Sequence, residues 1–308
     1  MGRTVELTAI VDSDLAPTPD VWKFAPVVGQ ALRLPTSATP KALGIVIQNI
    51  ICDMHACNLP RRSLGGGGSV VILMFMKFWI GTSGFQYAEW KGNFYPEDLP
   101  TAQMLPFYAE RFSTTEINYT FHRIPAPKTV ENWKTLTPGN FRFALKAPQK
   151  ITHWSKLRDC ADTLEYFLKV AGGLGERLGP ILFQLPPAFK KDADVLNSFL
   201  RELPDMRAAF EFRHESWFDD EIFDLLRSRN IALCIADTDA LSTPTKITAD
   251  YGYLRLRRED YADTDVKRWS DFVREQGSNW KDAFVYFKHE ESGIGPKLTR
   301  QMSEMLTA

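Results

Sequence analysis

Residues 208–217 read A-A-F-E-F-R-H-E-S-W and contain the pattern from which we predict the fold. Phe210 and Phe212 alternate with Glu211 and Arg213, so the rings share one face of a strand and the charged pair shares the other. Parallel strands are covered on both faces and are normally almost continuously apolar. The inner side chains at the C-terminal ends of (β/α)8-barrel strands are an exception, because active sites of that fold are built there. The same pattern on further strands would indicate such a barrel.

From residue 78 onward, strand-like and helix-like segments alternate with short connections, which is typical of an α/β protein with a parallel sheet. Eight strands and the helices between them occupy about the length of one TIM barrel. A doubly wound open sheet is the competing architecture, but G-T-S-G at residues 81–84 lacks the glycine spacing of a dinucleotide or phosphate loop. Strands are predicted over residues 78–82, 114–118, 141–146, 180–184, 208–212, 231–236, 251–257 and 283–287, and helices over 101–112, 127–136, 159–176, 193–203, 219–229, 265–276 and 296–306. Ser216 is placed to cap the helix that follows it.

The first part of the chain differs from the rest. Residues 1–76 mix proline-rich and polar pieces with a glycine run at 65–68, and show no sustained helical or strand period. We therefore predict an irregular N-terminal extension over residues 1–76 and a single barrel domain over 77–308. Our hypothesis is that translation in the native host begins at Met76 and that the residues before it are not part of the natural protein.

The composition is that of an ordinary globular protein of 308 residues, with 44% hydrophobic and 24% charged residues. The formal net charge of −1 gives no overall support for a nucleic-acid or membrane-surface role. The four cysteines are scattered, without the spacing of a zinc site or a disulfide framework. We expect a reducing, cytoplasmic location.

Assigning the apolar phase of each strand to the helix side leaves polar residues pointing into the barrel. In residues 141–146, for example, Phe143 and Leu145 face outward and Lys146 faces inward. Lys and Arg outnumber Glu by five to two in the resulting set, and surplus positive charge in a cleft suits an anionic ligand. The predicted inward set is Ser83, Glu116, Asn118, Lys146, Gln184, Glu211, Arg213, Arg255, Arg257 and Lys288. Asp237 could join this set, but the apolar strand before it leaves its phase open.

We interpret this set as an active site for a small anionic molecule, phosphorylated, carboxylated or nucleotide-like. Glu116 and Glu211 are the candidates for acid/base catalysis, and Lys146 and Arg213 for stabilising charge. Lys146 could also act as an electrophile, or as a Schiff-base amine if neighbouring cations lower its pKa. Ser83, Asn118, Gln184, Arg255, Arg257 and Lys288 are the candidates for substrate binding. Internal salt bridges of the barrel are the structural alternative for each charged pair.

Two further alternatives remain. Aromatic residues after several strands, including Tyr119, Trp154 and Trp217, could form a wall beside the cations. A non-catalytic protein that binds a ligand or single-stranded nucleic acid could use such a wall. We predict no cofactor, although a divalent metal in a hydrolase or isomerase could be held by carboxylates together with His214 or His289.

Several ordered motifs resemble the YecE-like family, catalogued as domain of unknown function seventy-two. They are G-T-S-G-F at 81–85, W-K-G-N-F-Y-P at 90–96, E-I-N-Y-T-F at 116–121, I-T-H at 151–153, Q-L-P-P at 184–187 and E-F-R-H-E-S-W at 211–217. The resemblance extends from about Lys77 to the C-terminus and leaves residues 1–76 uncovered. It implies a TIM barrel, and it implies no particular reaction, because the family has no generally established activity.

Overall fold

The computed structural model describes residues 9–10, 71–72, 76–289 and 293–307. The chain divides into two compact units, Met1–Phe75 and Met76–Ala308. In the first unit, the strands β1 (Ala9–Ile10) and β2 (Val71–Ile72) pair antiparallel. The rest of the predicted extension, including its proline-rich pieces and glycine run, lies outside the described residues.

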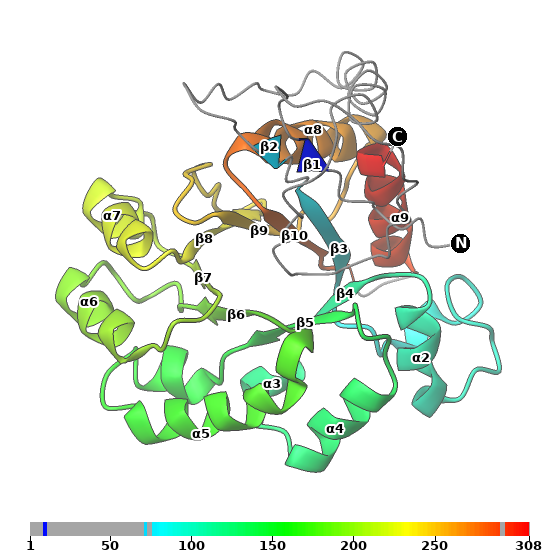
Figure 1. Ribbon diagram of the computed structural model, residues 1–308, viewed down its shortest axis with the longest axis horizontal. Helices are drawn as coiled ribbons and strands as arrows, with labels where there is room; N and C mark the ends of the chain where they lie inside the picture. Colours follow the sequence, from blue (N-terminus) through cyan, green and yellow to red (C-terminus); the bar gives the residue numbers. More distant parts are fainter. Residues whose placement is uncertain (1–8, 11–70, 73–75, 290–292, 308) are drawn as a thin grey trace, which may run out of the picture. The chain divides into compact units, whose positions relative to one another are not determined.

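Eight parallel strands close into a barrel in the second unit (Figure 1). Successive strands pair in chain order, and the last strand pairs with the first to close the ring. The predicted (β/α)8 barrel is therefore confirmed, and the open doubly wound sheet is excluded. The strands are β3 (Lys77–Ser83), β4 (Thr114–Ile117), β5 (Arg142–Lys146), β6 (Leu178–Gln184), β7 (Ala208–Glu211), β8 (Ala232–Asp237), β9 (Tyr251–Leu256) and β10 (Asp282–Phe287).

The helices lie around the outside of this ring of strands (Figure 1). Two are shorter than predicted by more than five residues, α2 (Met104–Ala109) and α5 (Ala161–Ala171). The segment over 101–112 opens with a 3-10 turn at Thr101–Gln103, and the α-helix within 159–176 ends where Gly172 and Gly173 follow, since glycine weakens helices. The α-helices are α2 (Met104–Ala109), α3 (Tyr119–His122), α4 (Pro127–Thr135), α5 (Ala161–Ala171), α6 (Ala193–Glu202), α7 (Asp220–Ser228), α8 (Asp263–Glu275) and α9 (Ile294–Thr307).

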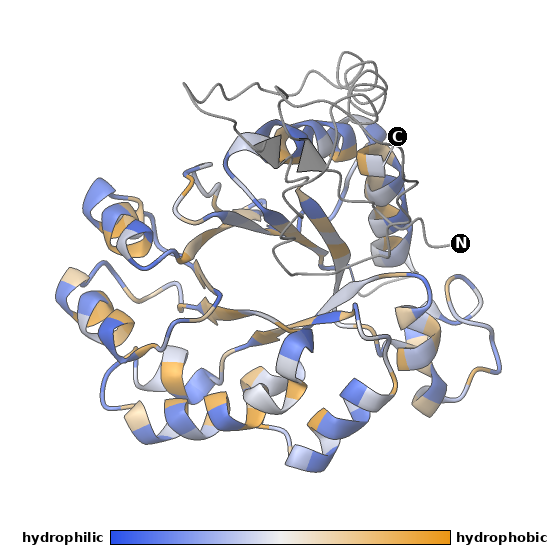
Figure 2. Cartoon of the chain, in the orientation of Figure 1, coloured by the Kyte–Doolittle hydropathy of each residue, from blue (hydrophilic) through white to orange (hydrophobic). Residues whose placement is uncertain are grey.

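The side chains that point outward from each strand form the core between the barrel and its helices. Phe210 and Phe212 of the opening stretch are both buried in this core, and Phe212 stacks on Trp217 with ring centres 4.8 Å apart. The strands β7 and β8 are mostly hydrophobic, whereas the helices mix hydrophobic and hydrophilic positions (Figure 2). Burial of this apolar surface is the main force that holds the helices on the barrel.

Inside the barrel, the N-terminal ends of the strands are filled by aromatic rings. Trp79 and Phe284 stack with centres 5.9 Å apart, and Trp79 Nε1 donates to Asp282 at 2.8 Å. Gly81 follows on the same inward phase, where a Cβ would come within 2.1 Å of the Thr114 carbonyl oxygen. Only glycine permits this close approach of β3 and β4. The packed end leaves the opposite, C-terminal end for polar residues.

Ser216 does not cap the following helix, contrary to the prediction. Its hydroxyl accepts a hydrogen bond from the Lys191 amide at 2.8 Å, because a 3-10 turn (Glu215–Trp217) intervenes before the helix. Asp219 instead caps α7 by accepting from the Glu221 amide at 3.0 Å.

None of the helices in the described part of the chain is both long enough and apolar enough to cross a membrane.

Candidate functional site

The predicted inward residues lie at the C-terminal ends of their strands and form two layers. Strand register places Ser83 beside Glu116, and Gln184 beside Glu211. We call the fully buried layer the floor: Ser83, Glu116, Gln184, Glu211 and Arg255, each at most 3% exposed. We call the half-buried layer the rim: Asn118, Lys146, Arg213, Arg257 and Lys288. The inward phase predicted for these strands thus agrees with the structure.

Arg255 joins the two buried carboxylates of the floor. Its Nη2 lies 2.8 Å from Glu116 Oε1, and its Nη1 lies 2.5 Å from Glu211 Oε2. The side chains of all three residues are at most 1% exposed. Burying charges is costly unless they are paired, so each carboxylate depends on this guanidinium. The pKa of Arg255 is raised well above its ordinary value, since the two carboxylates outweigh the effect of burial.

The carboxylate of Glu116 accepts hydrogen bonds from the side chains of Arg255, Ser83 and Tyr253. Ser83 Oγ donates to Oε1, and Tyr253 Oη donates to Oε2 at 2.6 Å. Burial by itself raises the pKa of this carboxyl, but the charge of Arg255 and these hydrogen bonds outweigh burial, and the net pKa lies below the usual value. Glu116 is therefore ionised at neutral pH.

Glu211 receives donors from four side chains. Gln184 Nε2 donates to Oε2 at 2.8 Å, while Arg213 Nε and Arg257 Nη1 lie 3.2 and 3.3 Å from Oε1. Burial raises the pKa of Glu211, but the charges of Arg255, Arg213 and Arg257 lower it far below the usual range. Three guanidinium groups thus converge on one carboxylate, which leaves positive charge uncompensated at the rim.

Lys146 ends β5 and points into the mouth, with its amine 3.9 Å from the centre of the Phe121 ring. Among the described residues, its amine has neither a hydrogen bond nor an ion pair. Burial, followed by the charge of Arg255, lowers the pKa of Lys146 to about 7. His153 meets the same Phe121 ring edge-on at 4.9 Å, and burial together with the charge of Lys146 lowers its pKa to about 4. His153 therefore lies beside Lys146 at the mouth, in the helical turn Lys150–Trp154.

Asn118 and Lys288 also belong to the rim. Asn118 Nδ2 donates to Ser83 Oγ at 2.8 Å and so connects the rim to the floor. Lys288 follows β10 directly, and its amide donates to the Leu256 carbonyl at 3.0 Å.

Asp237 does not join the inward set. Leu233 and Ile235 of β8 face the helices, and Asp237 has the same phase. Its carboxylate accepts from Trp269 Nε1 at 2.8 Å and from Tyr261 Oη at 2.9 Å, outside the barrel. The open question of its phase is therefore resolved in favour of a structural contact with α8.

The aromatic residues after the strands separate into two groups. Trp90 and Trp217 are buried and pack in the core, so they are not part of a wall around the mouth. Tyr119 and Trp154 are 50% and 69% exposed, on the segments that follow β4 and β5. Both of these rings are accessible for stacking.

The described residues contain no group of three or more His, Cys, Asp or Glu side chains that could hold a metal ion. His214 Nδ1 accepts from the Ser216 amide at 3.1 Å, and His289 Nε2 lies 2.6 Å from the Arg258 carbonyl oxygen. Both histidines suggested as metal ligands are thus engaged with the backbone.

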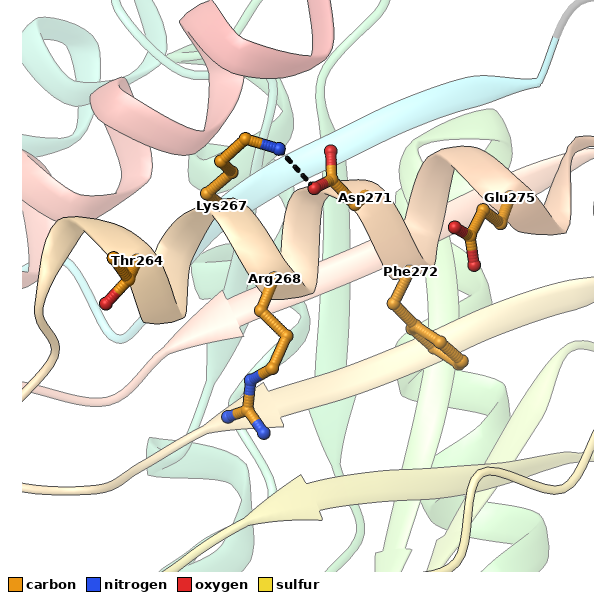
Figure 3. A pocket seen from close by; sticks show the side chains of 6 residues that line it. All are labelled: Thr264, Lys267, Arg268, Asp271, Phe272 and Glu275. Atoms are coloured by element: carbon orange, nitrogen blue, oxygen red, sulfur yellow. Dashed lines mark hydrogen bonds and ion pairs between the residues drawn. The ribbon is translucent and has the colours of Figure 1, made fainter.

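A surface hollow lies along α8, away from the residues of the mouth (Figure 3). Its charged side chains are exposed, and Lys267 pairs with Asp271 at 2.5 Å. It offers no buried polar group to a ligand. The lining residues are Thr264, Lys267, Arg268, Asp271, Phe272 and Glu275.

Tyr253 contacts the floor and was not included in the sequence interpretation. It is fully buried and donates to Glu116. The sequence pattern could have identified Tyr253, because it alternates in phase with Arg255 and Arg257 and so points inward from the same segment.

Comparison with known proteins gives one family. The family model described as "Protein of unknown function DUF72" matches residues 79–308. The UPF0759 protein YecE of Escherichia coli (strain K12) is 35% identical over 113 residues, which are 36% of this chain and 42% of YecE. The UPF0759 protein YunF of Bacillus subtilis (strain 168) is 23% identical over 256 residues, with coverage of 70% of this chain and 90% of YunF. The chain thus matches less than half of the length of YecE.

Among solved structures, a DUF72 family protein from Thermotoga maritima MSB8 is similar with a TM-score of 0.66 and 28% sequence identity. The alignment covers 75% of this chain and all of the Thermotoga chain. This similarity agrees with the barrel and adds no information on substrate or catalysis.

Proposed function

The chain belongs to the DUF72 family of proteins of unknown function, and from the geometry of its barrel mouth we propose that it is an enzyme acting on a small anionic molecule. The observation that carries this proposal is the convergence of Arg213, Arg255 and Arg257 on the single carboxylate of Glu211. Arg255 is also bound by Glu116, so the excess positive charge lies at the half-buried rim.

The rim is a suitable place for an anion. The contacts of Arg213 and Arg257 to Glu211 are long, at 3.2 and 3.3 Å, and Arg257 Nε is buried without a hydrogen-bond partner among the described residues. A phosphate or carboxylate can accept bidentate hydrogen bonds from guanidinium groups in such a position. Phosphorylated, carboxylated and nucleotide-like molecules share this anionic chemistry.

The proton-transfer role in this proposal belongs to Lys146. Glu116 and Glu211 are buried and ionised by their donors, so neither has a proton to give at neutral pH. Lys146 has a pKa of about 7, which lets its amine both accept and return a proton near neutral pH. The carboxylates then hold Arg255 and set the charge of the mouth.

A thermal-shift experiment on the full chain tests the anion site. Orthophosphate, sugar phosphates, nucleotides and dicarboxylates are the probes, and a bound probe raises the melting temperature by mass action. Arg257→Ala should abolish the shift, whereas Arg258→Ala should keep it, because Arg258 pairs with Asp237 and Asp265 outside the mouth. A shift that both variants keep, or no shift with any probe, would contradict the proposed site.

Lys146→Met separates an enzyme from a binding protein. If the chain is an enzyme, this variant should keep the shift produced by the bound anion and lose turnover of it. The alternative is a non-catalytic protein that binds a ligand or single-stranded nucleic acid. It is favoured by the exposed rings of Tyr119 and Trp154 on the segments that follow β4 and β5. Shifts with oligonucleotides alone, lost in Trp154→Ala, would support the alternative.

A further inference from the structure

Lys146 differs in its surroundings from the other charged residues of the mouth. Arg213, Arg255 and Arg257 each contact a carboxylate, but the amine of Lys146 has no hydrogen bond or ion pair within the described residues. Instead the amine lies over the apolar face of Phe121 at 3.9 Å. The Lys146 carbonyl accepts from Thr120 Oγ1 at 2.6 Å, which fixes the backbone below the side chain.

The protonation of this amine follows from its position. A half-buried amine on an aromatic face, near two guanidinium groups, loses hydration and meets like charge. Both effects lower its pKa, to about 7, although Glu116 and Glu211 oppose them. A large fraction of Lys146 is therefore uncharged at neutral pH and has a free electron pair.

We propose that Lys146 is a nucleophile that forms an imine with the carbonyl carbon of an anionic oxo compound. The assignment rests on the proposed function, since the guanidinium groups of the rim hold the anionic group while the amine meets the carbonyl. The substrate class is a carbonyl compound with a nearby carboxylate or phosphate. An oxo acid and a phosphorylated aldehyde or ketone both belong to this class.

The chemical step balances without another reactant. The electron pair of Nζ forms the new C–N bond, and the pair of the C=O π bond moves to oxygen. The two hydrogens of the amine leave with that oxygen as water, and a C=N bond replaces the C=O bond. Protonation of the imine nitrogen then withdraws electrons from the neighbouring carbon atoms, which assists bond cleavage or proton loss there.

Reductive trapping on the full chain tests the inference. The chain is incubated near neutral pH with pyruvate, with glyoxylate or with pyridoxal 5′-phosphate, in the presence of cyanoborohydride, which reduces an imine to a stable amine. Peptide mass spectrometry then measures the adduct at each lysine. We expect the initial rate at Lys146 to exceed that at Lys150 by more than about tenfold, because the half-buried amine of Lys146 has a lowered pKa and attacks in its uncharged form.

Matched variants locate the reaction. Lys150 is exposed and lies four residues along the chain from Lys146, so Lys150→Arg should leave the trapping unchanged and Lys146→Arg should abolish it. Arg257→Ala should slow trapping of the anionic probes, whereas Arg258→Ala should not. If one variant fails to fold, the lysine that carries the adduct in the unaltered chain still shows whether Lys146 is the nucleophile.

The outcomes separate this inference from the proposed function. Adducts spread evenly over exposed lysines, with an anion shift that still depends on Arg257, would overturn the imine and leave the anion site intact. Adducts at Lys146 that form at the same rate in Arg257→Ala as in the unaltered chain would overturn the substrate class. Loss of both the adduct and the anion shift would overturn both proposals.

Discussion

Replacing Arg255 by methionine should destabilise the barrel strongly, because it leaves two buried carboxylates without their shared cation. Glu116 and Glu211 are 0% and 1% exposed, and Arg255 contacts them at 2.8 and 2.5 Å. Breaking a buried pair by removal of one partner costs about 3–5 kcal/mol, a large part of the roughly 5–15 kcal/mol that stabilises a domain. For a domain of this size, the melting temperature should fall by roughly 6–20 °C.

The two carboxylates should respond differently in this variant. Glu211 keeps Arg213, Arg257 and Gln184 as donors. Among the described residues, Glu116 keeps the hydroxyl groups of Ser83 and Tyr253 as its hydrogen-bond donors and loses its ion pair, so burial should raise its folded pKa above the unfolded value of about 4.3.

The effect of Glu116 ionisation on the pH dependence of stability should therefore change sign. In the unaltered chain, the lowered pKa of Glu116 contributes stability above the unfolded pKa, which is lost as the pH falls through the folded pKa. In Arg255→Met, the raised pKa contributes stability that is present below about pH 4.3 and is lost as the pH rises through the folded pKa.

Urea denaturation at several pH values measures both effects. Lys267→Met is the matched control, since Lys267 also contacts its carboxylate partner, Asp271, at 2.5 Å but is 66% exposed. This control should lose less than about 1 kcal/mol. Adding Glu116→Gln to Arg255→Met should recover part of the lost stability, because one uncompensated charge is removed. An Arg255→Met protein within about 1 kcal/mol of the unaltered chain, with the same pH dependence, would refute the reasoning.

Three further outcomes are expected. Tyr253→Phe should lower the free energy of unfolding by about 1–3 kcal/mol in urea denaturation, because a buried carboxylate loses a donor at 2.6 Å; an unchanged midpoint would contradict this. Asp237→Ala should also lower the free energy of unfolding by about 1–3 kcal/mol, because Tyr261 and Trp269 lose the acceptor of their hydrogen bonds. This variant should keep any thermal shift that an anion produces at the mouth. Loss of that shift would place Asp237 in the site. The His153 imidazole should titrate near pH 4 when it is followed by NMR. Its contribution to stability should therefore be present above its unfolded pKa of about 6.5 and be lost as the pH falls towards 4. A titration midpoint near pH 6.5 would mean that His153 is not buried beside Lys146.

The barrel and the direction of its polar side chains were predictable from sequence, because both follow from local alternation. Once Phe143 and Leu145 face the helices, the pleat of the strand forces Lys146 inward. The same reasoning placed Glu211 and Arg255 correctly. It gave no phase for Asp237, because an all-apolar strand such as β8 has no alternation to read.

The partners of each side chain were not predictable, because they depend on register and distance across the barrel. Arg255 and Glu116 are 139 residues apart in the chain, and no local pattern indicates that they meet. The cap of α7 was missed for a related reason. A 3-10 turn between β7 and α7 moves the helix start from Ser216 to the residue after Asp219, and the sequence shows a suitable residue at both positions.

The division of the mouth into a floor and a rim has a consequence for how relatives of this protein can diverge. The floor holds two carboxylates and one guanidinium, and Arg213 and Arg257 of the rim supply further positive charge to Glu211, so the integrity of the floor does not require any bound molecule. The rim residues Lys146 and Asn118 make few contacts on which the barrel depends. Evolution can therefore exchange Lys146 and Asn118 at little cost in stability, while a change in the floor, or in Arg213 or Arg257 that pair with it, must be matched by another. Relatives that share the floor and differ at the rim would be one scaffold adapted to different small molecules.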